Sequence, residues 1–182
     1  MSDCITTYTG RHFDPLHPEE ALICIEDIAH ALSLICRGNG HVKSFFSVGQ
    51  HCILCAREAA ARSYSSRLSL AALLHDASEC YMSDVPRPFK KSLTDYLKQE
   101  EKLLKVIYRK YLGSALSQEE EMKLKSIDND LLWYDLKYLL GETPAEPKPV
   151  IHITVDYTVL PFKTVEEEYL KLFRQLSSQI WQ

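Results

Sequence analysis

The chain contains 182 residues, of which 46% are hydrophobic and 25% are charged. These proportions are typical of one folded globular domain, and they exclude a disordered, collagen-like or fibrous protein. The 21 Lys and Arg residues are outnumbered by 25 Asp and Glu residues, so the formal net charge is −4. This acidic balance argues against sequence-independent binding of duplex nucleic acid, although one basic pocket would still bind a small anion.

No apolar run approaches the ~20 residues that a membrane-spanning helix needs, and residues 1–10 lack the basic and apolar regions of a secretion signal. We therefore expect a cytoplasmic protein that does not contact a membrane. In that compartment, six cysteines in a chain of this length predict free, mostly buried thiols and no disulfide framework.

Two short strands are predicted near the N-terminus, at residues 5–9 and 23–25, where apolar residues alternate on either side of a turn-forming segment. Asp27 is expected to cap a helix over residues 28–36, because its carboxylate can accept hydrogen bonds from the free amides of a first helical turn. Gly38 follows and ends that helix.

Three longer helices are predicted next, over residues 48–63, 68–82 and 92–111, because apolar side chains recur there at helical spacing. Pro86 and Pro88 cannot continue a helix, so we expect a loop between the second and the third.

The capping box of Ser117 and Glu120 predicts a further helix that runs to Gly141. Residues 150–157 alternate like a strand that could pair with the N-terminal strands, and residues 165–181 form the last helix. The predicted fold is a mainly α helical bundle with a small peripheral β element, in a single domain spanning residues 1–182.

A polar pair, His75-Asp76, lies in an apolar part of the predicted helix over residues 68–82. Two adjacent polar groups are costly to bury unless something satisfies both, and a metal ion does so for an imidazole and a carboxylate together. Glu79 follows His75 by four residues, so on a continuous helix both side chains would project from one face.

Two further residues, His51 and Asp128, lie on neighbouring predicted helices and could point toward the same place. Two imidazoles and two carboxylates from three helices make a nitrogen and oxygen site with positions left for water. Such a set suits Mn²⁺, Co²⁺, Fe²⁺ or Zn²⁺. The alternative explanation is that these residues are helix caps or surface groups.

A second motif, the C-x-x-C of Cys52 and Cys55, is typical of zinc sites and of redox centres. The sequence offers no second cysteine pair at zinc-site spacing, and the motif lies in a predicted helix among apolar residues. Packing in the core therefore explains both cysteines.

The residues around the His75-Asp76 pair are similar to the sequence pattern of a known family. Residues 72–79 read ALLHDASE and residues 84–88 read DVPRP. This pattern resembles the HD-domain metal-dependent phosphohydrolases, and within them the deoxynucleoside 5′-monophosphate phosphohydrolases. The resemblance extends over about residues 20–140, and it implies an HD helical bundle that holds one divalent metal through four residues: His51, His75, Asp76 and Asp128.

The resemblance leaves Asp130 open as an alternative to Asp128, although the preceding Lys-Ser-Ile favours Asp128. HD proteins with two metals carry further histidines between the His-Asp pair and the last aspartate. No histidine lies between His75 and His152, so one metal is expected.

The roles of the remaining site residues are implied by the resemblance. Glu79 would move protons, and Asp84 would orient the sugar hydroxyl or the attacking water. Arg37 would bind the phosphate, since a guanidinium can hold two oxygens at once. His41 and Lys90 are further candidates for binding substrate.

The chain departs from the family directly after Arg37, where Gly38 stands in place of a bulky aromatic residue. A wall beside the sugar 2′ position is then missing, which places the discrimination of deoxyribose from ribose in doubt.

The sequence thus predicts a metal-dependent phosphohydrolase of (deoxy)nucleoside 5′-monophosphates, and the tendency of its relatives to pair favours a homodimer. Three alternatives remain: an HD-type phosphodiesterase, a non-catalytic nucleotide sensor, and an interaction module built on the cysteines. A single metal favours monoesters over diesters, and the presence of Glu79 and Asp84 argues against a sensor.

Overall fold

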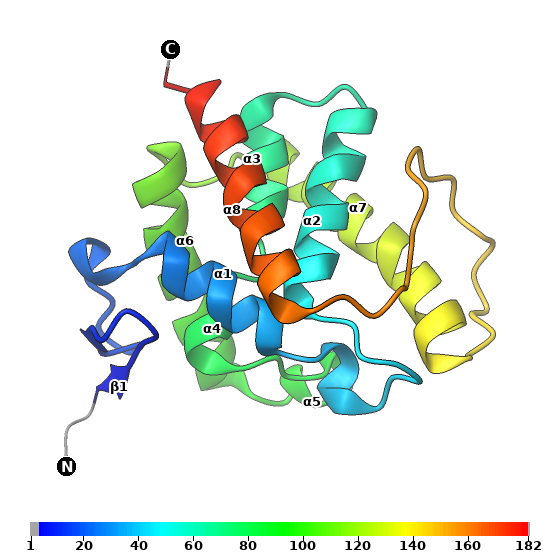
Figure 1. Cartoon of the computed structure of the whole chain (residues 1–182), viewed down its shortest axis with the longest axis horizontal. Helices are drawn as coiled ribbons and strands as arrows, with labels where there is room; N and C mark the ends of the chain where they lie inside the picture. Colours follow the sequence, from blue (N-terminus) through cyan, green and yellow to red (C-terminus); the bar gives the residue numbers. More distant parts are fainter. Residues whose placement is uncertain (1–3, 182) are drawn as a thin grey trace.

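The computed structural model describes residues 4–181 and is built mainly from helices (Figure 1). The strands and main helices are β1 (Ile5–Thr6), β2 (His12–Phe13), α1 (Ile25–Leu34), α2 (Val48–Ala61), α3 (Ser66–Leu74), α4 (Glu79–Met82), α5 (Arg87–Lys90), α6 (Thr94–Leu112), α7 (Gln118–Asp135) and α8 (Phe162–Ser178). Short helical turns lie at η1 (Glu20–Leu22), η2 (Arg37–Gly40) and η3 (Leu136–Leu140). The predicted fold class, mainly α with a small peripheral β element, is confirmed.

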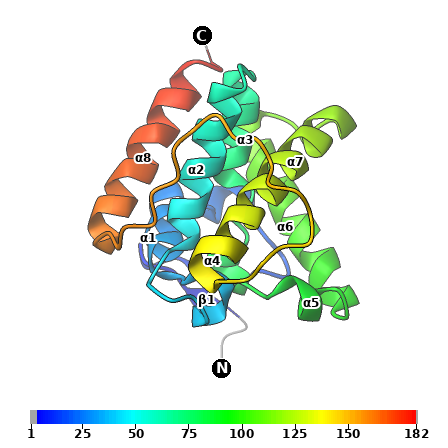
Figure 2. The same ribbon diagram turned by 90° about the vertical axis from the view of Figure 1, so that its right-hand side faces the viewer.

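Helices α2 and α3 form the centre of the molecule, and α1, α6, α7 and α8 pack around them (Figures 1 and 2). The alanines and cysteines of α2 are small enough for neighbouring helices to approach closely, and most of them are buried. Gly49 allows the closest approach, because a Cβ at this position would lie 3.2 Å from the carbonyl carbon and oxygen of Leu32 on α1. The N-terminal turn of α2 is thereby fixed against α1.

The helix predicted over residues 68–82 is wrong, because α3 ends at Leu74 and α4 begins only at Glu79. His75 Nδ1 donates to the carbonyl of Ala72 at 2.8 Å, the group that would accept the amide of Asp76 in a continuous helix. The chain then turns through tighter bonds, such as the Ala77 amide to the Leu74 carbonyl at 2.9 Å. His75 and Asp76 therefore lie in a turn, and the prediction that His75 and Glu79 share one helical face is corrected.

The N-terminal predictions need two corrections. β1 pairs antiparallel with β2, with Ile5 opposite Phe13, and residues 23–25 lead into α1 without forming a strand. Asp27 does not cap a helix, because it lies in the first turn of α1 and accepts bonds from Thr9, at 2.6 Å from the backbone amide and 3.0 Å from Oγ1. Its carboxylate instead fastens the N-terminal hairpin to α1.

The segment over residues 142–161, here called the strap, crosses the outside of α2 and α7 (Figure 2). Residues 150–157, which the structure describes in full, do not form the predicted strand. The backbone amide of His152 donates to the buried carboxylate of Glu58 on α2 at 2.9 Å, so the strap pairs with side chains and not with a sheet edge. Tyr134 Oη and Trp133 Nε1 of α7 also donate to strap carbonyls.

The capping box of Ser117 and Glu120 is present at the start of α7. The helix predicted to reach Gly141 is regular only to Asp135, and residues 136–140 form one wider π turn before Gly141 adopts a φ of 73°. The loop predicted around the two prolines contains the short helix α5. Within residues 4–181, no helix combines the length and apolar character needed to cross a bilayer.

Candidate metal centre

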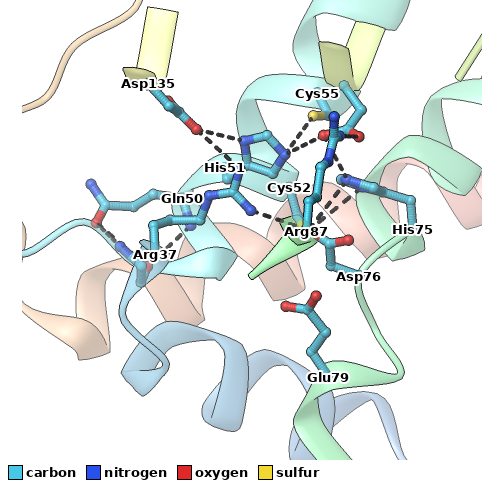
Figure 3. Close-up of polar contacts among 12 residues, drawn as sticks. Arg37, Gln50, His51, Cys52, Cys55, His75, Asp76, Glu79, Arg87 and Asp135 are labelled. Carbon is cyan, nitrogen blue, oxygen red and sulfur yellow. Dashed lines mark hydrogen bonds and ion pairs between the residues drawn. The ribbon is translucent and has the colours of Figure 1, made fainter. Parts of the chain in front are cut away.

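Three of the predicted metal ligands, His51, His75 and Asp76, lie together in the interior of the bundle (Figure 3), and Asp128 contacts both imidazoles. His51 comes from α2, Asp128 from α7, and His75 with Asp76 from the turn after α3. His51 Nε2 lies 3.2 Å from Asp128 Oδ1, and His75 Nε2 lies 3.3 Å from Asp76 Oδ2 and 3.8 Å from Asp128 Oδ1. Two donors held about 2.1 Å from one ion, at angles of about 90–109°, lie about 3.0–3.4 Å apart. Two of the three separations fall in this range, and the third, 3.8 Å between His75 Nε2 and Asp128 Oδ1, corresponds to a wider angle of about 130° at the ion. A small closing movement of Asp128 would bring all of these donors onto one cation.

The hydrogen bonds decide which imidazole nitrogens are free to bind a metal. His75 Nδ1 donates its proton to the Ala72 carbonyl, so Nε2 is the nitrogen that faces the two carboxylates and is left to bind a metal. His75 Nε2 is buried and has no hydrogen-bond partner among residues 4–181. An orphaned buried nitrogen beside carboxylates is expected where a metal would complete the set.

Charge at the site also favours a cation. Burial and Arg37 lower the pKa of His51, but Cys55 and the carboxylates of Asp128 and Asp135 raise it well above the ordinary value. Burial lowers the pKa of His75, but the charge of Asp76 raises it, and the net result is a pKa well above the ordinary value. A divalent ion at this place would displace these protons, so protons compete with the metal as the pH falls.

The alternative ligand Asp130 points elsewhere. Its Oδ2 accepts a bond from Arg62 at 2.8 Å, and Arg62 Nε donates to the buried Glu58 at 2.7 Å. This ion-pair cluster connects α2, α7 and the strap. Of the two aspartates, only Asp128 lies against the imidazoles.

Glu79, at the start of α4, lies beside the centre with 4% of its surface exposed, and its carboxylate points toward Asp76 (Figure 3). One oxygen, Oε2, has no hydrogen-bond partner within the described chain, and the other lies 3.8 Å from Lys90 Nζ. Burial, together with the charges of Asp76 and Asp84, raises the pKa of Glu79 well above its usual value. Glu79 therefore keeps its proton to a higher pH than an ordinary glutamate does.

The other predicted substrate residues divide into two groups. Arg37 Nη1 lies 3.7 Å from Asp76 Oδ2, so its positive charge is next to the predicted metal. Lys90 lies between Glu79 and Glu100, and burial raises the pKa of the half-buried Asp84. His41, in contrast, is exposed, and its side chain makes no hydrogen bond or ion pair with residues 4–181.

Sequence reasoning missed Asp135, a buried residue at the end of α7. Its Oδ2 lies 3.1 Å from Arg37 Nη2 and 3.4 Å from His51 Nδ1, and its Oδ1 accepts a bond from Tyr157 of the strap at 2.9 Å. A carboxylate on the far nitrogen of a ligating histidine fixes the ring and its tautomer. Helical spacing could have indicated this residue, because Asp135 follows Asp128 by two helical turns and so lies on the same face of α7.

Sequence reasoning also missed Arg87 on α5, whose guanidinium contacts Asp128 Oδ2 and donates to Asn129 Oδ1 at 2.8 Å. This arginine comes from the proline loop and is half exposed. It neutralises Asp128 from the solvent side of the centre.

The C-x-x-C cysteines are buried beside the two histidines and form no disulfide within the described chain. Cys55 Sγ lies 3.4 Å from His51 Nε2, and Cys52 Sγ lies 4.0 Å from His75 Nδ1. One donor atom from each of His51, Cys55 and His75 lies within 4.8 Å of the others. The interior of the bundle thus contains buried His, Cys and Asp groups that could hold a metal ion.

Comparison with known proteins gives the relationships of the chain. No family model matches it. It is 31% identical over 157 residues to the uncharacterized protein RCAP_rcc00048 of Rhodobacter capsulatus, an alignment that covers 79% of this chain and 80% of that protein. The chain belongs to the family of this protein.

The chain is also 42% identical over 109 residues to the uncharacterized protein YfdR of Escherichia coli. That match covers 59% of this chain, and it spans only 57% of YfdR. Neither name states an activity, so the geometry of the metal centre is the main indication of function.

Proposed function

We propose that the protein is a metal-dependent phosphohydrolase that releases phosphate from nucleoside 5′-monophosphates. One observation carries the proposal: two imidazoles and two carboxylates converge in the interior, beside the buried Glu79, one oxygen of which has no hydrogen-bond partner within residues 4–181. A structural ion pair would not require that glutamate. A cluster of titratable groups whose surroundings shift their pKa values is typical of a catalytic site.

A divalent ion held by His51, His75, Asp76 and Asp128 would lower the pKa of a water molecule and polarise a phosphoryl oxygen. The mixed nitrogen and oxygen donors suit Mn²⁺, Co²⁺, Fe²⁺ or Zn²⁺. The chain's own contribution is to fix these donors, through the Ala72 carbonyl at His75 and the Asp135 carboxylate at His51.

Arg37 supplies the fixed positive charge for the phosphate. Its guanidinium is held by Asp135 at 3.1 Å and lies 3.7 Å from Asp76, so its charge is next to one of the proposed metal ligands. A phosphomonoester dianion carries two charges, which a metal and a guanidinium would match together. Lys90, beside Glu79, adds a second cation at the edge of the site.

Glu79 moves the proton. Its raised pKa favours the protonated carboxyl group, which would donate its proton to the 5′ oxygen as the P–O bond breaks. Asp84, whose charge raises the pKa of Glu79, would orient the sugar hydroxyl or the attacking water. This division of roles makes a monophosphate the natural substrate.

The test compares kcat/KM for dAMP, AMP, dADP and dATP, each with Mn²⁺, Co²⁺, Mg²⁺ and Zn²⁺. We expect monophosphates to be the best substrates, because a longer phosphate chain would place extra charge beyond Arg37. The preference for dAMP over AMP should be modest. Gly38 lies at a φ of 59°, and its missing side chain provides neither a wall nor an unpaired polar group against a 2′-hydroxyl.

Arg37→Ala should raise KM for dAMP, and Arg109→Ala, which removes an exposed arginine from α6, is the matched control. Equal efficiency on dATP, or an unchanged Arg37→Ala enzyme, would contradict the proposed phosphate site. Binding of nucleotide without any release of phosphate would favour a sensor, and hydrolysis of cyclic nucleotides alone would favour a phosphodiesterase.

A further inference from the structure

We infer that the Cys55 thiolate is an additional ligand of the metal, so that the centre binds through nitrogen, oxygen and sulfur. This inference rests on the metal centre of the proposed function and extends it to the choice of metal. A thiolate ligand favours Zn²⁺ or Co²⁺ over Mn²⁺ and Mg²⁺.

The position of Cys55 follows from its helix. It lies four residues after His51 on α2, so the two side chains project from one face about one turn apart. Cys55 Sγ lies 3.4 Å from His51 Nε2, the nitrogen that faces Asp128. A sulfur at about 2.3 Å and a nitrogen at about 2.0–2.1 Å from one zinc ion, at a tetrahedral angle, would lie about 3.6 Å apart. The observed separation therefore suits shared coordination.

The bonding of Cys55 supports the same role. Its side chain is fully buried, and within the described chain its one polar partner is His51 Nε2. That nitrogen also lies 3.2 Å from the Asp128 carboxylate, to which its N–H donates, and it loses its proton when it binds a metal. When the metal binds, the thiol loses this partner, and it regains one by giving up its proton to solvent and forming a metal–sulfur bond. Each such bond formed releases one proton.

Cys52 is the natural comparison, because it is equally buried and one residue from His51. It lies 4.0 Å from His75 Nδ1, but this nitrogen is occupied by its bond to the Ala72 carbonyl. His75 Nε2, the nitrogen left free, is on the opposite side of the ring. Donor atoms of Cys52, His75 and Asp76 also lie within 4.8 Å of one another. The shorter contact of Cys55 with a ligating nitrogen nevertheless favours Cys55 over Cys52 as the ligand.

The test is a titration of the metal-stripped, full-length chain with Co²⁺, followed by absorption spectroscopy. Visible d–d bands report cobalt binding, and a near-ultraviolet thiolate-to-cobalt band reports a sulfur ligand. We expect both in the wild type and in Cys52→Ser, and we expect Cys55→Ser to keep the d–d bands while losing the thiolate band. Cys55→Ser should also lower the affinity for Zn²⁺ relative to Mn²⁺ by about tenfold or more.

The outcomes separate this inference from the proposed function. Cobalt bound by the wild type without a thiolate band would overturn the role of Cys55 and leave the metal centre intact. A thiolate band that disappears in Cys52→Ser and persists in Cys55→Ser would also overturn it. Absence of any cobalt binding would overturn the metal centre on which both proposals rest. Where Cys55→Ser fails to fold, a thiolate band that persists in Cys52→Ser still assigns the ligand to Cys55, and its loss in Cys52→Ser overturns the inference.

Discussion

Glu79→Gln is expected to slow phosphate release by about a hundredfold or more while metal binding is retained, which is the usual scale of general acid and base catalysis. Glutamine has the shape of glutamic acid but cannot donate the proton to the leaving oxygen. Glu79 Oε2 has no hydrogen-bond partner within residues 4–181, so the substitution removes no structural bond at that atom. Metal content and kcat are measured on the same preparation.

Stability provides a control for this variant. The folded pKa of Glu79 is raised, so the folded protein holds a proton that the unfolded chain releases at lower pH. The contribution of Glu79 to stability is therefore lost as the pH rises from the ordinary glutamate range through the folded pKa. Glu79→Gln does not titrate, and it should be at least as stable as the wild type at neutral pH.

A second control distinguishes Glu79 from its neighbour. Glu100 binds Lys90 at 2.5 Å, and Lys90 also contacts Glu79. Glu100→Gln should therefore have a much smaller effect than Glu79→Gln. Equal losses in the two variants would show that the effect passes through Lys90, and wild-type rates in Glu79→Gln would contradict the assigned role.

Asp128→Asn should abolish almost all metal binding and phosphate release, and Asp130→Asn should leave both largely unchanged. Asp128 Oδ1 lies within 3.8 Å of both imidazoles, and an amide oxygen is a far weaker ligand than a carboxylate. Asp130 instead binds Arg62. Its removal should cost about 1 kcal/mol of stability, equivalent to a fall of about 2–4 °C in Tm for a domain of this size.

Metal content, phosphate release and Tm are measured for both variants. Arg87→Ala is the control for the lost ion pair between Arg87 and Asp128, and it should keep the metal. Retention of metal in Asp128→Asn together with its loss in Asp130→Asn would transfer the ligand role to Asp130.

The parts of the site that local spacing determines could be predicted from the sequence. His51 lies at the start of an alanine-rich buried helix, and Asp128 lies on a helix whose capping box is visible in the sequence. The pair His75-Asp76 stands out because polar groups in an apolar run need a partner. These three positions meet in the structure.

The parts that depend on tertiary contacts could not be predicted. The break after Leu74 arises when the His75 side chain takes the Ala72 carbonyl, and periodicity carries no information about such a bond. Asp135 gains its role only because Tyr157 and Arg37, 22 and 98 residues away in the chain, are brought to it. Residues 150–157 of the strap alternate like a strand, but the buried carboxylate of Glu58 accepts the backbone amide of His152, and no sheet edge pairs with this segment within the described chain.

The most direct measurement is a titration of the metal-stripped protein with Mn²⁺ or Co²⁺ in which bound metal and phosphate released from dAMP are determined together. If one ion held by His51, His75, Asp76 and Asp128 supports the reaction, phosphate release should rise in proportion to bound metal and reach its maximum at one equivalent per chain. Phosphate release from the stripped protein, or its absence at full metal occupancy, would contradict this account.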